Sequence, residues 1–266
     1  MHTTIEQSIR SKRQSGSPAV IPYLTCGFPT RAALRSQIEQ LAPLSAVIEL
    51  GVAFSDPMAD GVTIQRSSAV ALQNEASLDW LLTELKGVRS ACPLAIMSYL
   101  NPLLTISAGT LGPRLKEANI AGLIIPDLPL EESEALREEM ASLGIALIQM
   151  VTPATPPERA KLIASRSGGF LYAVTSMGVT GGSAGAGSSG GASGGSPGPS
   201  LDSVGSYLAG LRAISPVPVA AGFGIRTREQ VLALQPHADA LIVGSALIEA
   251  IEKGQSPGEF IAGLIA

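Results

Sequence analysis

The sequence is short of cysteine, of histidine and of clustered basic residues. It has two cysteines and two histidines in 266 residues, and its formal net charge is −4. Two cysteines are too few for a disulfide framework, so we expect reduced, buried thiols at Cys26 and Cys92 and a cytosolic protein. A nucleic-acid-binding protein needs a basic footprint, and neither the charge nor any run of lysine and arginine provides one.

Long apolar runs are also missing. No stretch approaches the roughly 18 consecutive apolar residues that a membrane-spanning helix needs, and residues 1–16 contain no apolar run of the signal-peptide type. Those residues instead have the spacing of a short amphipathic helix, with Ile5 and Ile9 on one face. We therefore expect no contact with a membrane, and an extra helix before the first strand.

The scarcity of histidine and the placement of lysine restrict the chemistry. His2 and His237 are the only histidines, and with two distant cysteines they form no pattern of metal ligands. The lysines all fall in helix-like segments or at helix ends, whereas a Schiff-base aldolase needs an amine on a strand. The sequence thus predicts no metal and no other cofactor, and it leaves carboxylates as the groups for proton transfer.

Eight short apolar runs recur along the chain, separated by helical patterns. They begin at Ala19, Ala46, Leu94, Gly122, Ala146, Phe170, Val217 and Ala240. Near-continuous apolarity is typical of strands that are covered on both faces. Because 45% of residues are hydrophobic and 15% are charged, a large core is possible, and the eight units predict an α/β fold: a (β/α)8 TIM barrel formed as a single domain by residues 1–266. A doubly wound sheet is the alternative, but no glycine-rich fingerprint follows the first strand.

Two connections exceed the usual length of a loop between a strand and a helix. One follows the second apolar run and covers residues 53–77. The other follows the sixth run and contains residues 182–200, which are almost wholly Gly, Ser and Ala. Long loops in a compact domain are commonly functional lids or disordered segments. The composition predicts a flexible Gly/Ser-rich lid loop at 182–200, with an inert linker as the alternative.

In such a barrel the active site lies at the C-terminal ends of the strands, so polar residues there are candidates. Glu49 lies within an otherwise apolar strand, where loss of hydration would raise its pKa toward that of a general acid. Asp60 follows in the next loop, and two carboxylates in different surroundings can take different roles. Three alternatives stay open: Glu49 could face outward and pair with a helix cation, residues 55–61 could form only a turn, and Asp127 after the fourth strand could be a third carboxylate or a cap.

Glycine-bearing segments end the last two strands, and each leads into a helix. Backbone N–H groups at a helix N-terminus bind anions well, and barrels commonly hold phosphate at this position. The candidate phosphate ligands are Gly181, Gly224, Gly244 and Ser245. Tight turns without any ligand are the alternative explanation for these glycines.

One long motif points to a known family. The segment Glu49–Gln65, ELGVAFSDPMADGVTIQ, closely resembles the signature of the tryptophan synthase α subunit. Further matching segments follow in the expected order, among them PYLT from Pro22, PDLP from Pro126, GVTG from Gly178 and GFGI from Gly222. The resemblance covers essentially the whole chain apart from the Gly/Ser stretch. It implies a lyase of tryptophan biosynthesis that cleaves indole-3-glycerol phosphate to indole and glyceraldehyde 3-phosphate.

The resemblance also implies roles for individual residues. Glu49 would protonate C3 of the indole and then accept the glycerol hydroxyl proton, while Asp60 would stabilise the charge that develops at the ring nitrogen. The residues that match substrate-lining positions are Tyr23, Ile64, Met97, Ile124, Tyr172, Thr180 and Phe223. Asp56 and Pro57 match the loop that contacts a β subunit. An α2β2 heterotetramer is therefore expected, whose β subunit uses pyridoxal phosphate to consume the indole.

The chain departs from the family after Gly181, where larger and charged residues are usual. Glycine loses more entropy on ordering, so we expect weaker loop closure and weaker coupling to a partner. Two other functions stay open from the sequence. One is another phosphate-binding barrel enzyme, such as a sugar-phosphate isomerase or indole-glycerol-phosphate synthase, although the synthase would need a strand lysine. The other is a non-catalytic barrel that binds a phosphorylated ligand or only activates a partner subunit.

Overall fold

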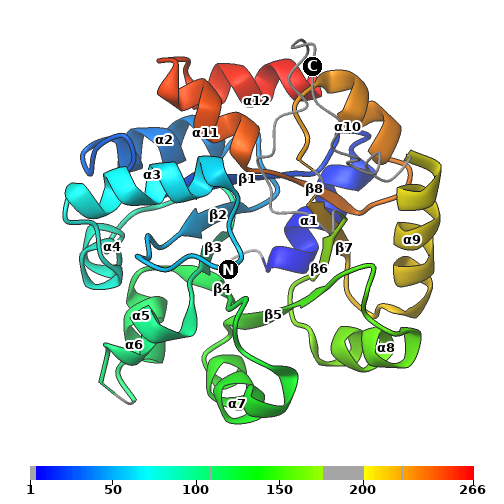
Figure 1. Ribbon diagram of the computed structural model, residues 1–266, viewed down its shortest axis with the longest axis horizontal. Helices are drawn as coiled ribbons and strands as arrows, with labels where there is room; N and C mark the ends of the chain where they lie inside the picture. Colours follow the sequence, from blue (N-terminus) through cyan, green and yellow to red (C-terminus); the bar gives the residue numbers. More distant parts are fainter. Residues whose placement is uncertain (1–3, 108, 176–200, 223) are drawn as a thin grey trace, which may run out of the picture.

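The computed structural model describes residues 4–107, 109–175, 201–222 and 224–266, with Leu201 described in its backbone only. Eight parallel strands in these ranges form a closed barrel in the order of the sequence (Figure 1). They are β1 (Val20–Thr25), β2 (Ile48–Gly51), β3 (Leu94–Met97), β4 (Ile120–Ile124), β5 (Ala146–Val151), β6 (Leu171–Val174), β7 (Val219–Gly222) and β8 (Ala240–Val243). Parallel pairing of β8 with β1 closes the ring. The predicted TIM barrel is confirmed.

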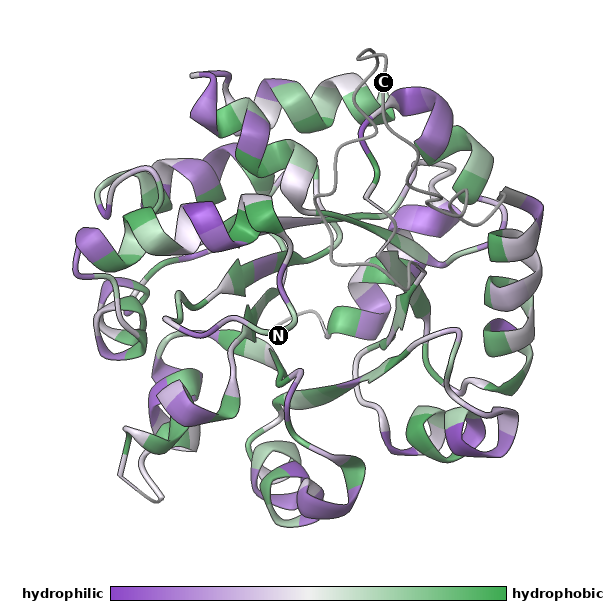
Figure 2. Cartoon of the chain, in the orientation of Figure 1, coloured by the Kyte–Doolittle hydropathy of each residue, from purple (hydrophilic) through white to green (hydrophobic). Residues whose placement is uncertain are grey.

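Helices surround the strands as an outer ring. They are α2 (Ala33–Leu41), α3 (Val62–Gln73), α4 (Leu78–Glu84), α5 (Leu100–Leu104), α6 (Leu111–Glu117), α7 (Glu134–Ser142), α8 (Pro157–Arg166), α9 (Leu201–Ile214), α10 (Arg228–Leu234), α11 (Ser245–Glu252) and α12 (Pro257–Ile265), with a 3-10 turn η1 (Leu130–Glu132) before α7. Figure 2 shows hydrophobic residues along the strands and most of the hydrophilic residues on the helices. This distribution is what a parallel sheet covered by amphipathic helices requires.

The side chains of each strand alternate between two apolar layers, because successive residues of a strand point to opposite faces. On β2, Ile48 and Leu50 pack in the layer between strands and helices. Val47 packs inside the barrel instead. The buried core of the interior consists of Ile5, Ile9, Ala19, Ile21, Ala46, Val47, Ala95, Ile124, Ile148, Phe170, Ala220, Ala240 and Ile242. The interior is therefore packed with side chains below the level of Glu49, as in other barrels of this class.

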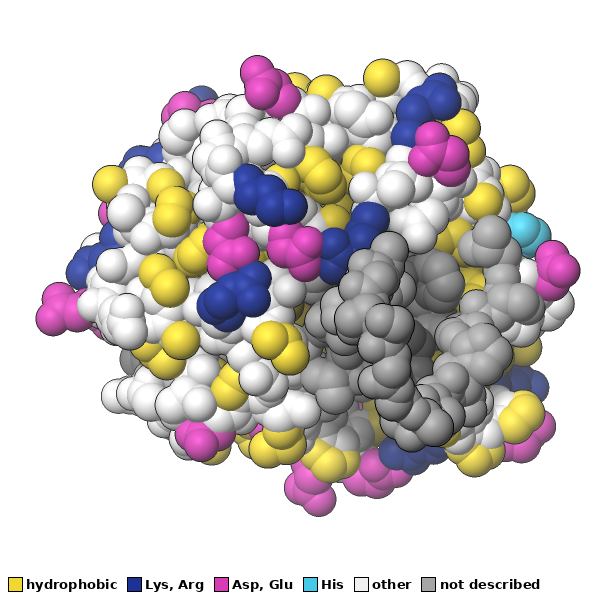
Figure 3. All heavy atoms as spheres, turned by 45° about the horizontal axis from the view of Figure 1, so that its top comes forward, with side chains coloured by type: hydrophobic (Ala, Val, Ile, Leu, Met, Phe, Trp, Pro, Cys, Tyr) yellow, Lys and Arg dark blue, Asp and Glu magenta, His cyan; other side chains and the backbone are white. Residues whose placement is uncertain are grey.

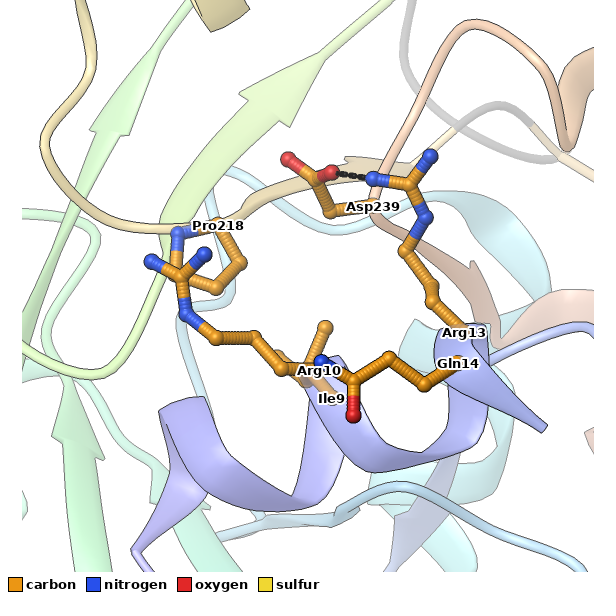
Figure 4. Close-up of a pocket in the computed structure, with 6 residues that line it drawn as sticks. All are labelled: Ile9, Arg10, Arg13, Gln14, Pro218 and Asp239. Atoms are coloured by element: carbon orange, nitrogen blue, oxygen red, sulfur yellow. Dashed lines mark hydrogen bonds and ion pairs between the residues drawn. The ribbon is translucent and has the colours of Figure 1, made fainter.

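Helix α1 (Ile5–Gln14) closes the N-terminal end of the barrel, as Figure 1 shows at the centre of the ring. Ile5 and Ile9 are 2% and 0% exposed and belong to the interior core, so the predicted amphipathic helix is confirmed. Arg13 of this helix pairs with Asp239, which precedes β8 (Figure 4). Asp239 also accepts a hydrogen bond from the Val219 N–H at 2.8 Å, so α1 is tied to the start of two strands.

Two expectations about connections need correction. Residues 53–77 are not a simple long loop, because they include α3. The buried face of α3 carries Thr63, Ser67 and Ser68 alongside Ile64 and Ala71, and these polar residues obscure its helical periodicity. The third apolar run, which was expected to extend through Asn101, ends at Met97, and α5 begins at Leu100. The predicted lid at 182–200 lies outside the described residues.

Two smaller expectations can be compared with the structure directly. Cys26 and Cys92 are both free and buried, as predicted from their number and spacing. Across the described ranges, no helix combines the length and the apolar character needed to span a membrane.

Candidate active site

Glu49 lies on β2 and faces the inside of the barrel. Its register partners are Tyr23 on β1 and Ala95 on β3, and Ala95 belongs to the interior core. Val47, two residues earlier, also lies in that core, so strand alternation places Glu49 on the same side. The side chain is only 1% exposed. The alternative of an outward-facing Glu49 paired with a helix cation is therefore excluded.

The Glu49 carboxyl group is buried, and no described residue forms a hydrogen bond with its oxygens, Oε1 and Oε2. Burial and, to a smaller extent, repulsion from the nearby Asp60 carboxylate together raise the pKa of Glu49 from 4.5 to about 8. The group is thus largely protonated at neutral pH. A protonated carboxyl group in a dry cavity, with both oxygens unpaired, is suited to donate a proton to a ligand.

Asp60 lies at the end of the loop between β2 and α3, where its side chain is partly buried. Burial raises its pKa from 3.8 to about 6, and a hydrogen bond from Tyr99 acts in the opposite direction. The Gln65 side chain donates to the Asp60 carbonyl at 2.9 Å and fixes the backbone at this point. Because the pKa of Asp60 is about 6 and that of Glu49 is about 8, Asp60 can be charged at neutral pH while Glu49 is protonated.

Tyr99 is a site residue that the sequence reasoning missed. It follows β3, is 4% exposed, and accepts a hydrogen bond from the Ala59 N–H at 2.8 Å. Its hydroxyl also forms a hydrogen bond with the Asp60 side chain, so Tyr99 contacts two successive residues of this loop. The signal for it was strand parity. Ala95 and Met97 are inward positions, and position 99 continues their alternation beyond the strand end.

Two tyrosine rings lie over inward-facing glycines at the barrel mouth. A Cβ at Gly51 would overlap the Tyr23 hydroxyl oxygen, and one at Gly222 would lie 3.0 Å from the Tyr172 ring. Burial raises the pKa of Tyr172, as does the charge of Glu49, so its hydroxyl stays protonated close to that carboxyl group. Glycine at these positions makes room for the two rings. The rings provide apolar walls beside Glu49.

The remaining predicted substrate-lining residues fall into two groups. Met97 and Ile124 are register partners on β3 and β4, and both pack with the barrel interior. Ile64 lies in the first turn of α3, is 6% exposed, and belongs to the same hydrophobic cluster as Tyr23. Thr180 and Phe223 lie outside the described residues.

The predicted phosphate ligands lie beyond β7 and β8. Gly244 directly precedes α11, and Ser245 is its first residue, so the free N–H groups of this helix start at the strand end. Gly224 has φ +61°, a conformation that favours glycine, and it is exposed. It lies four residues before α10, whose start is capped by Thr227 and Gln230. Gly181 lies outside the described residues.

The other acidic residues near the mouth have structural partners. Asp127 accepts a hydrogen bond from the Leu100 N–H at 2.8 Å, so it caps the start of α5. Asp56 is exposed, accepts a hydrogen bond from the Ser55 hydroxyl, and lies with Pro57 in a turn. The segment therefore forms the predicted turn, and the site role of Asp60 stays a prediction. In the part of the chain that the structure describes, no three His, Cys, Asp or Glu side chains form a group that could hold a metal ion.

Comparison with known proteins identifies the family. A family model described as tryptophan synthase alpha chain matches residues 9–262. The tryptophan synthase alpha chain of Desulfovibrio desulfuricans is 38% identical over 264 residues, covering 97% of this chain and 98% of that relative. The alpha chain of a Synechocystis species is 38% identical over 256 residues, covering 95% and 91%. A crystal structure of tryptophan synthase subunit alpha from Legionella pneumophila has a TM-score of 0.84 at 28% identity, covering 99% and 97% of the two chains. The chain belongs to the tryptophan synthase alpha chain family.

Proposed function

We propose that Glu49 and Asp60 are the acid–base pair with which this chain performs the reaction of its family. The chain is a carbon–carbon lyase of tryptophan biosynthesis that cleaves indole-3-glycerol phosphate to indole and glyceraldehyde 3-phosphate. The family match does not favour the non-catalytic barrel, the sugar-phosphate isomerase or the indole-glycerol-phosphate synthase considered from the sequence.

The first step needs a proton at C3 of the indole ring. The protonated Glu49 carboxyl group supplies it, and its pKa of about 8 keeps that proton available at neutral pH. The carboxylate left behind then accepts the proton of the glycerol hydroxyl as the carbon–carbon bond breaks and the aldehyde forms. Glu49 is protonated again at the end of the cycle, so one residue serves as acid and then as base.

The second carboxylate supports the charge that appears during this step. Protonation at C3 places positive charge on the indole nitrogen, and the Asp60 carboxylate accepts a hydrogen bond from that N–H. The Tyr99 hydroxyl stabilises the charged form of Asp60, because its hydrogen bond lowers the Asp60 pKa against the effect of burial. Backbone N–H groups at Gly224, Gly244 and Ser245 bind the phosphate, joined by Gly181. Tyr23, Ile64, Met97, Ile124, Tyr172, Thr180 and Phe223 surround the indole.

One observation carries this assignment: a 1% exposed carboxyl group at the barrel mouth whose two oxygens lack a partner among the described residues. The test is indole release from indole-3-glycerol phosphate by the wild type, by Glu49→Gln and by Glu117→Gln. Glu117 is an exposed carboxylate on α6 that pairs with Lys86, and it serves as the matched control. We expect Glu49→Gln to lose about 10²- to 10⁴-fold in kcat, the range of a general acid–base group, while the control keeps wild-type activity. A wild type that releases no indole, alone or with a β subunit, would remove the proposed function.

A β subunit is the partner that we infer for this chain, in an α2β2 heterotetramer. Two large apolar side chains are exposed: Met58, which follows Pro57 in the chain, is 78% exposed, and Leu104 of α5 is 70% exposed. A groove of about 450 Å³ between α5, α6 and α7 adjoins Leu104. Exposed apolar clusters of this kind mark protein–protein interfaces. Substitution of Met58 by Asp should weaken binding of a β subunit in titration calorimetry, and unchanged binding would exclude this surface.

We also infer, from the family, that residues 1–266 act as one barrel domain and that the chain works in the cytoplasm.

A further inference from the structure

Three loops of the barrel mouth carry the groups assigned above. The loop after β2 ends at Asp60 and leads into α3, the loop after β7 contains Gly224, and the turn after β8 holds Gly244 before α11. We call the backbone N–H groups at Gly224, Gly244 and Ser245 the phosphate cradle. The Asp60 carboxylate must lie at the right distance from this cradle if one substrate is to contact both. The question is what fixes these loops relative to one another.

A single carboxylate, Glu249 of α11, accepts hydrogen bonds from the first turn of α3 and from the loop after β7. Its Oε1 accepts a hydrogen bond from the Thr63 hydroxyl at 3.1 Å and another from Arg226 at 2.9 Å. Its Oε2 accepts a second hydrogen bond from Arg226 at 2.6 Å. Glu249 lies one helical turn after Ser245, so it belongs to the helix that starts at the cradle.

Each partner of Glu249 is close in the chain to a site group. Thr63 is 4% exposed in the first turn of α3, and Gln65 from the same turn binds the Asp60 carbonyl. Arg226 follows Gly224 by two residues, and the Ile225 side chain between them is 0% exposed, which anchors the loop in the core. The backbone N–H of Arg226 is also bound, by the Gln230 side chain at 2.7 Å.

A second ion pair joins the same two helices without touching the site loops. Arg66 of α3 donates two hydrogen bonds of 2.6 Å to Glu252 of α11. Figure 3 shows basic and acidic side chains gathered on one face of the molecule. The Arg66–Glu252 pair links α3 to α11 as Glu249 does, but its bonds do not involve the loop after β7. It therefore provides a natural comparison on the same surface.

We propose that Glu249 is a positioning residue that holds the Asp60 loop and the phosphate cradle at a fixed separation, through Thr63 on one side and Arg226 on the other. The proposal rests on the proposed function, because it assigns a purpose to the geometry of that same site. Glu249 does not touch the substrate. Its two arms act on different steps: the Thr63 arm orients the acid–base loop, and the Arg226 arm orients the loop that binds phosphate.

This division predicts different kinetic effects for loss of the Thr63 contact and loss of the Arg226 contact: the first should lower kcat, and the second should raise KM. Thr63→Val keeps the shape of the side chain and removes the hydroxyl, so we expect kcat to fall about fivefold with KM nearly unchanged, because the misplaced group acts in the transition state. Arg226→Met removes the guanidinium, so we expect KM for indole-3-glycerol phosphate to rise about tenfold with kcat nearly unchanged, because the loss is one of ground-state binding. Glu249→Gln should show both effects together. A residue that only stabilised the fold would not separate kcat from KM.

The decisive experiment compares Glu249→Gln with Glu252→Gln in steady-state kinetics, with thermal unfolding and glycerol 3-phosphate binding measured in parallel. We expect a loss of about 10- to 50-fold in kcat/KM and weaker glycerol 3-phosphate binding for Glu249→Gln, and less than twofold changes for Glu252→Gln. The exchanged pair Glu249→Arg with Arg226→Glu should recover part of the binding loss, since it restores the ion pair with reversed polarity.

Three results would overturn the proposal: equal losses in Glu249→Gln and Glu252→Gln, wild-type kinetics in Glu249→Gln, or the same kcat and KM pattern for Thr63→Val and Arg226→Met. If Glu249→Gln does not fold, the comparison of the two single-arm variants decides alone. Failure of the proposed function has a different signature, because the wild type would then release no indole while all variants could still be ranked by glycerol 3-phosphate binding.

Discussion

Replacement of Glu49 by Gln should make the protein increasingly stable relative to the wild type as the pH rises, besides lowering its activity. The folded protein holds Glu49 with a pKa of about 8, against 4.5 for the unconstrained group. Below pH 4.5 the folded and unfolded states are both protonated, and the group gives no difference in stability. As the pH rises through 4.5, the unfolded state loses its proton and the folded state keeps it. The folded state therefore loses stability with rising pH until the folded pKa is passed.

The size of this loss follows from the shift. Each pKa unit corresponds to about 1.36 kcal/mol, so the loss is below about 1 kcal/mol at pH 5 and about 4 kcal/mol at pH 8. The glutamine side chain of the variant does not ionise and would not show this loss. The stability gained by Glu49→Gln should therefore grow by about 3 kcal/mol between pH 5 and pH 8. Taking the difference between two pH values cancels any effect of the buried amide itself, because that effect does not depend on pH.

The assay is urea denaturation of the wild type and Glu49→Gln at pH 5, 6.5 and 8, with Glu117→Gln as the control for a lost surface carboxylate. Glu117 is exposed, and its pKa is lowered by a hydrogen bond from Lys86, so its substitution should give no gain that grows toward pH 8. Parallel stability curves for wild type and Glu49→Gln across this range would refute the reasoning, because Glu49 would then ionise normally in the fold. The protein would keep an acid of ordinary strength, and the first step of the mechanism would lose its proton donor.

Three further predictions concern the same site and the barrel floor. The pH profile of kcat/KM should be bell-shaped, rising near pH 6 as Asp60 ionises and falling near pH 8 as Glu49 ionises. Because the Asp60 charge helps to raise the Glu49 pKa, Asp60→Asn should shift the falling limb to lower pH. An unchanged falling limb would contradict this. Gly51→Ala should raise KM and cost about 1–3 kcal/mol of stability, since the new Cβ would overlap the Tyr23 hydroxyl oxygen, and a wild-type KM would show that this ring moves freely. Ile9→Ala should lower the free energy of unfolding by about 2–5 kcal/mol in urea denaturation, because Ile9 is 0% exposed. Its kcat should be unchanged, because Ile9 lies at the end of the barrel away from the site. A loss of kcat without a loss of stability would contradict this prediction.

The sequence predicts the barrel well because its strands are buried on both faces and therefore apolar without interruption. Seven of the eight predicted runs contain a strand, and the fourth, which begins at Gly122, overlaps β4, which begins two residues earlier at Ile120. Ile5 and Ile9 lie where their spacing placed them. Element bounds were less predictable. The inward face of α3 is largely Thr and Ser, which bury little apolar area, so nothing in the hydropathy pattern marks residues 62–73 as a helix.

The candidate site divides along similar lines. Glu49 stands out in the sequence because it interrupts an apolar strand, but only the strand pairing with Tyr23 and Ala95 determines which way it faces. Tyr99 and Glu249 were missed for a different reason. Their roles depend on contacts with residues 40 and 186 positions away in the chain. Strand parity indicates only that Tyr99 faces inward, and local pattern does not identify the distant partner of either residue.

The floor formed by α1 has a consequence for where protons can travel. Ile5, Ile9 and the apolar side chains above them leave no polar path from the base of the barrel to Glu49 within the described residues. Exchange between this carboxyl group and bulk water must then run through the opening at the C-terminal ends of the strands, where the proposed function also places the substrate. Under the proposed function, a substrate in that opening would separate the carboxyl group from bulk water, so its proton would pass to the indole ring and not to solvent.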